Sequence, residues 1–352
     1  MDRTPKQKVG DYLAALPYVI GHVPTQDHLV VTCFGYDRKS VVHLDLEWEP
    51  GTEPRSVARF VERALEDAEP IARAAVVGYG PEGHHRAADV ADEINESLDI
   101  PTDTFHIAEG TWRILDRLTG GWSEPSPVPE APPKHMLGRA AEPAASREDL
   151  YASVAPLPKP LFTKLDQRRA QHLDSLGPRT RSEIAVGALD DLATTRPGDP
   201  AHQQVLAHLA TTDLVIRDVV LAHALDEDHH RARVDALIQT CRAAPPSLRP
   251  PLASLAAAAT FLTAGHPPMV EGLLQNADPT SGLAYLIGCA LRGGENPASI
   301  RPGAVEAAQD GLREAEDAWC ASQRPRSPRP GSGPSTPQPA EQSTSGVEPP
   351  RL

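Results

Sequence analysis

Three glycines, Gly78, Gly80 and Gly83, form the part of this sequence that most resembles a functional motif, because they match the pattern G-x-G-x-x-G. In dinucleotide-binding proteins such glycines let the backbone approach a pyrophosphate, which the N–H groups of the following helix then bind. The context here argues against that chemistry, since the motif follows the third predicted strand rather than the first and Pro81 removes one N–H donor. An ordinary Gly/Pro loop explains the pattern better. The loop still lies at the carboxyl end of a predicted parallel strand, where ligand crevices form, so these glycines and His84 are the best-located candidates for binding a small molecule.

Histidines and acidic residues provide the next candidates. His84 and His85 begin a predicted helix, where a solvated pair explains them better than a ligand contact. Residues 226–230, Asp-Glu-Asp-His-His, look like metal ligands, but neighbouring helical residues point about 100° apart. Only His223 with Asp226 or Glu227 would converge, and an acidic cap on a surface helix is the better explanation. His202 and His208 are six residues apart and cannot share a helical face, so we predict no metal site.

No nucleophile or cofactor motif stands out in the remaining sequence. Cys33 lies in a predicted strand, where a small buried side chain is the expected role. Strings typical of serine hydrolases, zinc proteases and Walker-type nucleotide sites are missing from the sequence. We therefore predict no cofactor, leave catalytic residues unassigned, and favour a protein that is not an enzyme.

The charge of the chain bears on its partners and location. It carries 34 Lys and Arg against 48 Asp and Glu, a formal net charge of −14, which disfavours polyanionic partners. One local basic stretch, residues 159–181, could contact nucleic acid, but a solvated or domain-docking face explains it better. The four cysteines are far apart, and neither an apolar leader nor a run of about 18 apolar residues is present. We expect a cytoplasmic protein, and the abundance of Ala, Arg, Pro and Gly suggests a bacterial source.

Hydrophobic periodicity predicts an α/β domain over residues 1–122. Strict alternation along residues 41–48 indicates a strand with one buried face, and the apolar run at 74–77 indicates a strand that is covered on both faces. Amphipathic spacing predicts helices over residues 57–68 and 87–98. Together with a strand at 28–34 and a hairpin over 105–114, these elements predict a mixed, partly parallel sheet of about five strands.

The rest of the chain loses this strand character. Nine prolines between Ser123 and Pro160 predict a linker, interrupted by one short helix that starts at Ser146. For residues 161–321 the sequence predicts an all-α domain of antiparallel helices separated by Pro/Gly breaks. Residues 322–352 hold eight prolines and no aromatic residue, so they predict a disordered tail.

Three stretches carry a resemblance to a known family: residues 11–31, residues 138–150 and the helical stretch 252–300. Together they resemble a bacterial family built on a domain of unknown function, number 4192, over roughly residues 9–305. Members of the family often carry cysteines and a Gly-Thr-Pro-like turn where this chain has residues 116–125, so a site built on those features is missing here. The resemblance supports the domain plan and implies no activity, cofactor or catalytic residue.

Three hypotheses about function remain open at this point. The first is a non-enzymatic binding or adaptor protein whose partner is a protein or a small molecule. The second is an enzyme or small-molecule-binding protein that uses the crevice at residues 78–83, with a phosphorylated or nucleotide-like metabolite as one candidate ligand. The third is a nucleic-acid-associated factor that uses the basic stretch 159–181.

Overall fold

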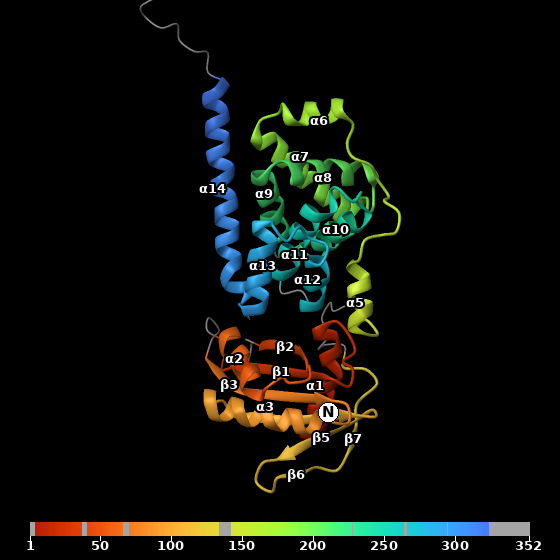
Figure 1. Cartoon of the computed structure of the whole chain (residues 1–352), viewed down its shortest axis with the longest axis vertical. Helices are drawn as coiled ribbons and strands as arrows, with labels where there is room; N and C mark the ends of the chain where they lie inside the picture. The colour runs from red at the N-terminus through yellow and green to blue at the C-terminus, as the bar shows by residue number, and fades with distance from the viewer. Residues whose placement is uncertain are drawn as a thin grey trace, which may run out of the picture.

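The computed structural model describes residues 4–36, 41–65, 70–133, 142–226, 228–263, 266–293 and 295–323. An α/β region and a helical region lie one above the other along the long axis of the molecule (Figure 1). This confirms the predicted fold class. No described helix is long and apolar enough to cross a membrane.

The α/β region is built on one mixed sheet of seven strands in the order β2-β1-β3-β4-β5-β6, with β7 paired to β5. Among these strands only β3 and β4 are parallel neighbours, and all the other pairs are antiparallel. The two strands beyond the predicted five, β6 and β7, are two residues long, too short for any alternation of side chains to indicate them. The strands are β1 (His28–Gly35), β2 (Val41–Glu47), β3 (Ile71–Tyr79), β4 (Thr102–Ala108), β5 (Thr111–Asp116), β6 (Gly121–Trp122) and β7 (Ser126–Pro127).

Helices cover both faces of this sheet. The helices α2 (Pro54–Ala64) and α3 (Gly83–Leu98) pack on one face, and α1 (Pro5–Ile20) packs on the other. Successive residues of β3 alternate between these two cores: Val76 belongs to the α2/α3 core, while Val77 and Tyr79 belong to the α1 core. The run at 74–77 is therefore covered on both faces, as predicted.

The helical region contains a run of helices whose starts follow the prolines in the sequence. Proline at the first turn loses no helical hydrogen bond, and it stands there in α7, α8, α11 and α12. Every residue of α11 from Leu252 to Leu262 is buried, so the other helices pack around it. The helices are α5 (Arg147–Val154), α6 (Gln167–Asp174), α7 (Pro178–Asp190), the π-helical turn η1 (Asp191–Thr195), α8 (Pro200–Thr212), α9 (Leu214–Ala224), α10 (His230–Ala243), α11 (Arg249–Leu262), α12 (Pro267–Leu274), α13 (Gly282–Gly293) and α14 (Pro297–Gln323).

The stretch predicted as a linker contacts both regions where it is described. Val128 packs on the α1 core of the sheet, and Val154 packs in the core of the helical region. Its one predicted helix is α5, which Ser146 caps by accepting a hydrogen bond from the N–H of Asp149. Of the predicted tail, residues 322 and 323 end α14, and the rest lies outside the described residues.

Candidate functional site

An open cleft of about 980 Å³ lies at the carboxyl ends of the parallel strands β3 and β4. One wall is α1, and another is the segment 23–27 that leads from α1 into β1. Among the residues that the structure describes, three acidic residues line the cleft and no basic residue does. The lining residues with charged or polar side chains are Tyr18, Thr25, Gln26, Asp27, Tyr79, Glu109 and Glu130.

The glycines of the G-x-G-x-x-G pattern serve close packing beside this cleft. A Cβ on Gly78 would overlap the carbonyl group of Gly83, so α3 can start against β3 only because both residues are glycine. Gly80 has φ +78°, and a Cβ there would lie 2.6 Å from the backbone of Gln26. Gly80 lines the cleft, whereas Gly78, Gly83 and His84 do not.

His84 belongs instead to a group of rings at the start of α3. Its Nδ1 lies 2.8 Å from the carbonyl oxygen of Pro81, and its ring centroid is 3.8 Å from that of His85. His106 and Trp122 complete the group, and His106 Nε2 lies 2.7 Å from the carbonyl oxygen of Gly80. These contacts hold the loop 80–83 in place.

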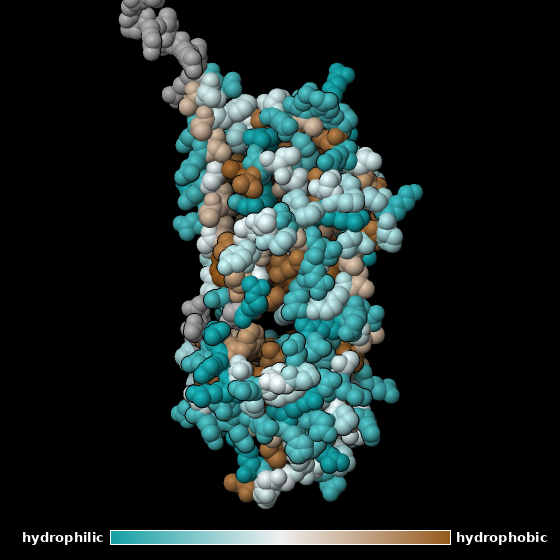
Figure 2. All heavy atoms as spheres, viewed as in Figure 1, coloured by the Kyte–Doolittle hydropathy of each residue, from teal (hydrophilic) through white to brown (hydrophobic). Residues whose placement is uncertain are grey.

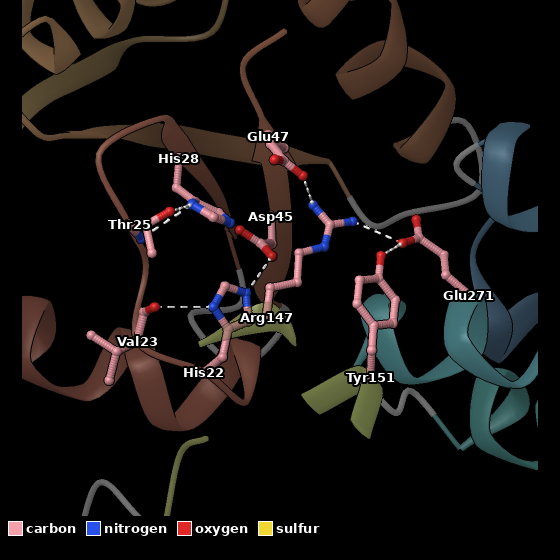
Figure 3. Close-up of polar contacts among 9 residues, drawn as sticks. All are labelled: His22, Val23, Thr25, His28, Asp45, Glu47, Arg147, Tyr151 and Glu271. Atoms are coloured by element: carbon pink, nitrogen blue, oxygen red, sulfur yellow. Dashed lines mark hydrogen bonds and ion pairs between the residues drawn. The ribbon is translucent and has the colours of Figure 1, made fainter. Parts of the chain in front are cut away.

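A second group of polar residues, the His–Asp triad of His22, His28 and Asp45, is buried where the α/β region faces the helical region (Figure 3). His22 follows the end of α1 and His28 begins β1. Asp45 lies on β2, on the face opposite Leu44 and Leu46, which pack toward α2 and α3. The side chains of His22 and Asp45 are 0% and 2% exposed, and His22 Nε2 lies 2.8 Å from Asp45 Oδ2.

The hydrogen bonds of the triad leave some of its atoms unsatisfied. His22 Nδ1 lies 3.2 Å from the carbonyl oxygen of Val23, so both of its ring nitrogens face oxygen acceptors. His28 Nδ1 accepts a hydrogen bond from the N–H of Thr25 at 3.1 Å. His28 Nε2 and Asp45 Oδ1 are buried without a hydrogen-bond partner, a costly state for polar atoms.

Burial and charge act on the two histidines in opposite ways. Burial alone would lower the pKa of His22, but the hydrogen bond and the negative charge of Asp45 outweigh it and raise this pKa. Burial lowers the pKa of His28. The ring centroids are 5.0 Å apart, and the pKa of His22 is shifted upward while that of His28 is shifted downward.

Arg147 on α5 joins the triad to the helical region. One of its terminal nitrogens lies 3.0 Å from Glu47 on β2, and the other lies 2.8 Å from Glu271 on α12. Tyr151, one turn further along α5, donates its hydroxyl to the same Glu271 carboxylate (Figure 3). The guanidinium group thus bridges the two regions.

The polar face of β2 takes part in a further buried chain of hydrogen bonds. Tyr12 on α1 donates its hydroxyl to Thr32 Oγ1 at 2.7 Å, and Thr32 Oγ1 lies 3.0 Å from His43 Nδ1. The sequence predicted one buried face for this strand, with His43 and Asp45 on the other face. The second face was expected to be exposed, and that expectation is wrong at His43 and Asp45, because α1 and the loop that follows it cover this face as well.

A family profile for a domain of unknown function, DUF4192, matches residues 10–298. The chain belongs to the DUF4192 family. The matched residues include the cleft, the His–Asp triad and the bridge at Arg147. No curated protein and no solved structure shows significant similarity to this DUF4192 chain.

The remaining candidates of this DUF4192 chain are engaged in other contacts. Asp226 pairs with Arg233 at 3.3 Å, while His223 Nε2 lies 2.9 Å from Asp190, and Glu227 lies outside the described residues. His202 pairs with Asp191 and His208 with Asp174, so these two histidines point to separate partners, as their spacing predicted.

Two further predictions concern Cys33 and the basic stretch. Cys33 is buried in the α2/α3 core, and burial raises the pKa of its thiol to about 12, which keeps it protonated and unreactive. In the basic stretch, Arg181 pairs with Asp213 at 2.6 Å and Arg179 pairs with Glu183 at 3.4 Å.

Sequence reasoning did not single out the triad. His22 and His28 flank a loop, and Asp45 lies on a neighbouring strand, so no spacing in the chain shows that the three converge. The polar alternation along β2 was the one available signal, because His43 and Asp45 share a face that could be covered.

Proposed function

We propose that this protein binds a small, largely apolar molecule that carries a positive charge, in the cleft beside β3 and β4. The observation that carries this proposal is the charge of the cleft: within the described parts of the chain, three carboxylates and no basic residue line it. Clefts of a few hundred to about 1,000 Å³ at the carboxyl edge of parallel strands are common ligand sites.

The same observation argues against the phosphorylated or nucleotide-like ligand that the glycine pattern suggested. A phosphate group placed in the cleft would be repelled by Glu109 and Glu130, whereas an ammonium or guanidinium group would be attracted. Asp27 contributes less, because it pairs with Arg86 at 2.7 Å. Apolar surface from Leu13, Ala14 and Ile107 would hold the rest of the ligand.

Ligand screening with a charge-reversed comparison tests this proposal. Apolar amines should raise the melting temperature of the full chain, and matched carboxylates and phosphates should not. The double variant Glu109→Gln/Glu130→Gln should bind the best amine about tenfold more weakly, because a charged hydrogen bond contributes about 1.5–3 kcal/mol. Binding of phosphates in preference to amines would refute the proposal.

Two further variants separate the cleft from general effects of charge and folding. Glu62→Gln/Glu96→Gln removes the same charge from exposed positions on α2 and α3, outside the cleft, and should leave amine affinity unchanged. Ala14→Phe should fill the cleft from α1 and abolish binding, and circular dichroism should show that it folds. A Gly80→Asp variant is unsuitable, because any side chain at φ +78° would strain the loop whether or not a ligand binds there.

The adaptor hypothesis also stays a proposal, and one pair of exposed residues supports it. Tyr285 and Leu286 on α13 are 64% and 63% exposed, and hydrophobic residues gather over this part of the viewed face (Figure 2). If they dock a protein, a Tyr285→Ser/Leu286→Ser variant should lose a partner that the unaltered chain captures reproducibly. Identical captures by the two chains would count against this role.

A further inference from the structure

We propose that His22, His28 and Asp45 form a binding site for a divalent transition-metal ion of the Zn²⁺ class. One ligand atom from each residue lies within 4.8 Å of the other two. Two imidazoles and one carboxylate form a donor set that Zn²⁺ and neighbouring first-row metals accept. Bonds of about 2.0–2.2 Å to a central ion would draw these atoms slightly closer together.

The triad is already buried and converging, as Figure 3 shows. His28 is only 4% exposed, yet its Nε2 has no hydrogen-bond partner, and the same holds for Asp45 Oδ1. Leaving two buried polar atoms unpaired is unfavourable, and bonds to a metal ion would satisfy both of them. This pair of orphan atoms distinguishes the triad from an ordinary buried ion pair.

Contacts outside the triad orient both rings. Metal-bound histidines commonly donate their second N–H to a backbone carbonyl or a similar acceptor, and His22 Nδ1 has the carbonyl oxygen of Val23 at 3.2 Å for this purpose. His28 must change tautomer, because its Nδ1 accepts from the N–H of Thr25 at present. When Nε2 gives up its proton to bind the metal, that proton moves to Nδ1, which donates it to Thr25 Oγ1, 2.9 Å away, and the N–H of Thr25 loses His28 as its acceptor.

The charges around the triad favour a divalent cation. The positive charge of Arg147 acts on both histidines, and Glu47 and Glu271 neutralise it. Asp45, Glu47 and Glu271 carry three negative charges against the one positive charge of Arg147, which leaves an excess of two negative charges when the histidines are neutral. A divalent ion would balance that excess.

The position of the site gives the metal a structural effect independent of the proposed ligand. His22 and His28 flank the segment 23–27, which forms one wall of the cleft. An ion bound to both histidines would tie together the two ends of that wall. Three protein ligands would also leave a coordination position for water or another ligand.

Metal uptake by the full chain tests the proposal. After treatment with a chelator and dialysis, the unaltered chain should bind one equivalent of Zn²⁺ in competition with a chromophoric chelator. His28→Gln and Asp45→Asn should each weaken binding by at least about tenfold, since even residues that only support a ligand change affinity by 10–100-fold. The variant His202→Gln is the matched control, because His202 contacts Asp191 and Asp199 at the surface, and it should bind as the unaltered chain does.

Co²⁺ provides a readout that does not depend on any variant. The unaltered chain should give the intense visible absorption of four- or five-coordinate Co²⁺ with nitrogen ligands, which decides the matter even if His28→Gln or Asp45→Asn fails to fold. The proposal is overturned if the unaltered chain takes up no Zn²⁺, if Co²⁺ keeps the weak spectrum of the hydrated ion, or if folded His28→Gln and Asp45→Asn variants retain full affinity.

Discussion

Several buried hydroxyls in the helical region and two buried side chains in the α/β region find their hydrogen-bond partners in different ways. In the helical region the hydroxyls of Thr240, Ser254 and Thr260 each donate to the carbonyl oxygen four residues earlier in the same helix. In the α/β region two of the bonds join distant parts of the chain: Tyr12 bonds to Thr32, twenty residues on, and His22 bonds to Asp45, twenty-three residues on.

This difference helps to distinguish buried polar groups that only pack from those that can bind a ligand. A hydroxyl that bonds back within its own helix is satisfied wherever the helix packs, so its burial carries no information about a ligand. A group whose partner comes from another element is satisfied only in the folded arrangement, and some such groups are left over. His28 and Asp45 hold two such unpartnered atoms within one group of three converging ligand residues, which is why the triad, rather than the helical core, is the stronger candidate site.

The largest expected effect on stability comes from replacing a glycine by alanine in each of the two regions. Gly78→Ala should destabilise the protein by about 3 kcal/mol, because the new Cβ overlaps the backbone of Gly83 and forces α3 away from β3. Gly187→Ala on α7 meets nothing within 4 Å and should stabilise by about 0.5–1 kcal/mol, since alanine favours a helix. Urea unfolding followed by circular dichroism measures both, and equal shifts of the midpoint would contradict this account of the glycine pattern.

An intermediate effect is expected from removing one buried hydroxyl in each region. Thr32→Val should cost about 2 kcal/mol, because Tyr12 and His43 both lose a buried partner. Thr260→Val should cost less than about 1 kcal/mol, because the carbonyl oxygen of Ala256 still accepts a hydrogen bond within the helix. If the two variants unfold at the same urea concentration, the proposed contrast between hydrogen bonds within one helix and hydrogen bonds between distant elements does not hold.

The smallest expected effect concerns the bridge between the regions. Arg147→Met keeps an aliphatic stem against Tyr151 but removes both ion pairs, and it should cost about 1 kcal/mol because the partner carboxylates remain partly hydrated. Arg179→Met removes an exposed pair with Glu183 on α7 and should change stability by less than about 0.5 kcal/mol. Thermal unfolding compares the two variants, and a larger loss for Arg179→Met would show that the bridge contributes no more than a surface pair.

Much of the fold followed from the sequence because its signals are local. The alternation along 41–48, the helical spacing at 87–98 and the proline breaks after residue 160 each reflect neighbours within one element, and each element formed. The two short strands β6 and β7 and the cover over the polar face of β2 depend on how elements pack, so no local pattern indicated them.

The amino-acid sequence alone determined the order of the elements, the acidic charge and the glycines that allow α3 to start against β3, because each depends on residues close together in the chain. Only the tertiary structure decided what gathers around those elements. It placed His22, His28 and Asp45 together and put an acidic cleft beside Gly80, because such contacts form when the sheet, α1 and α5 pack against one another.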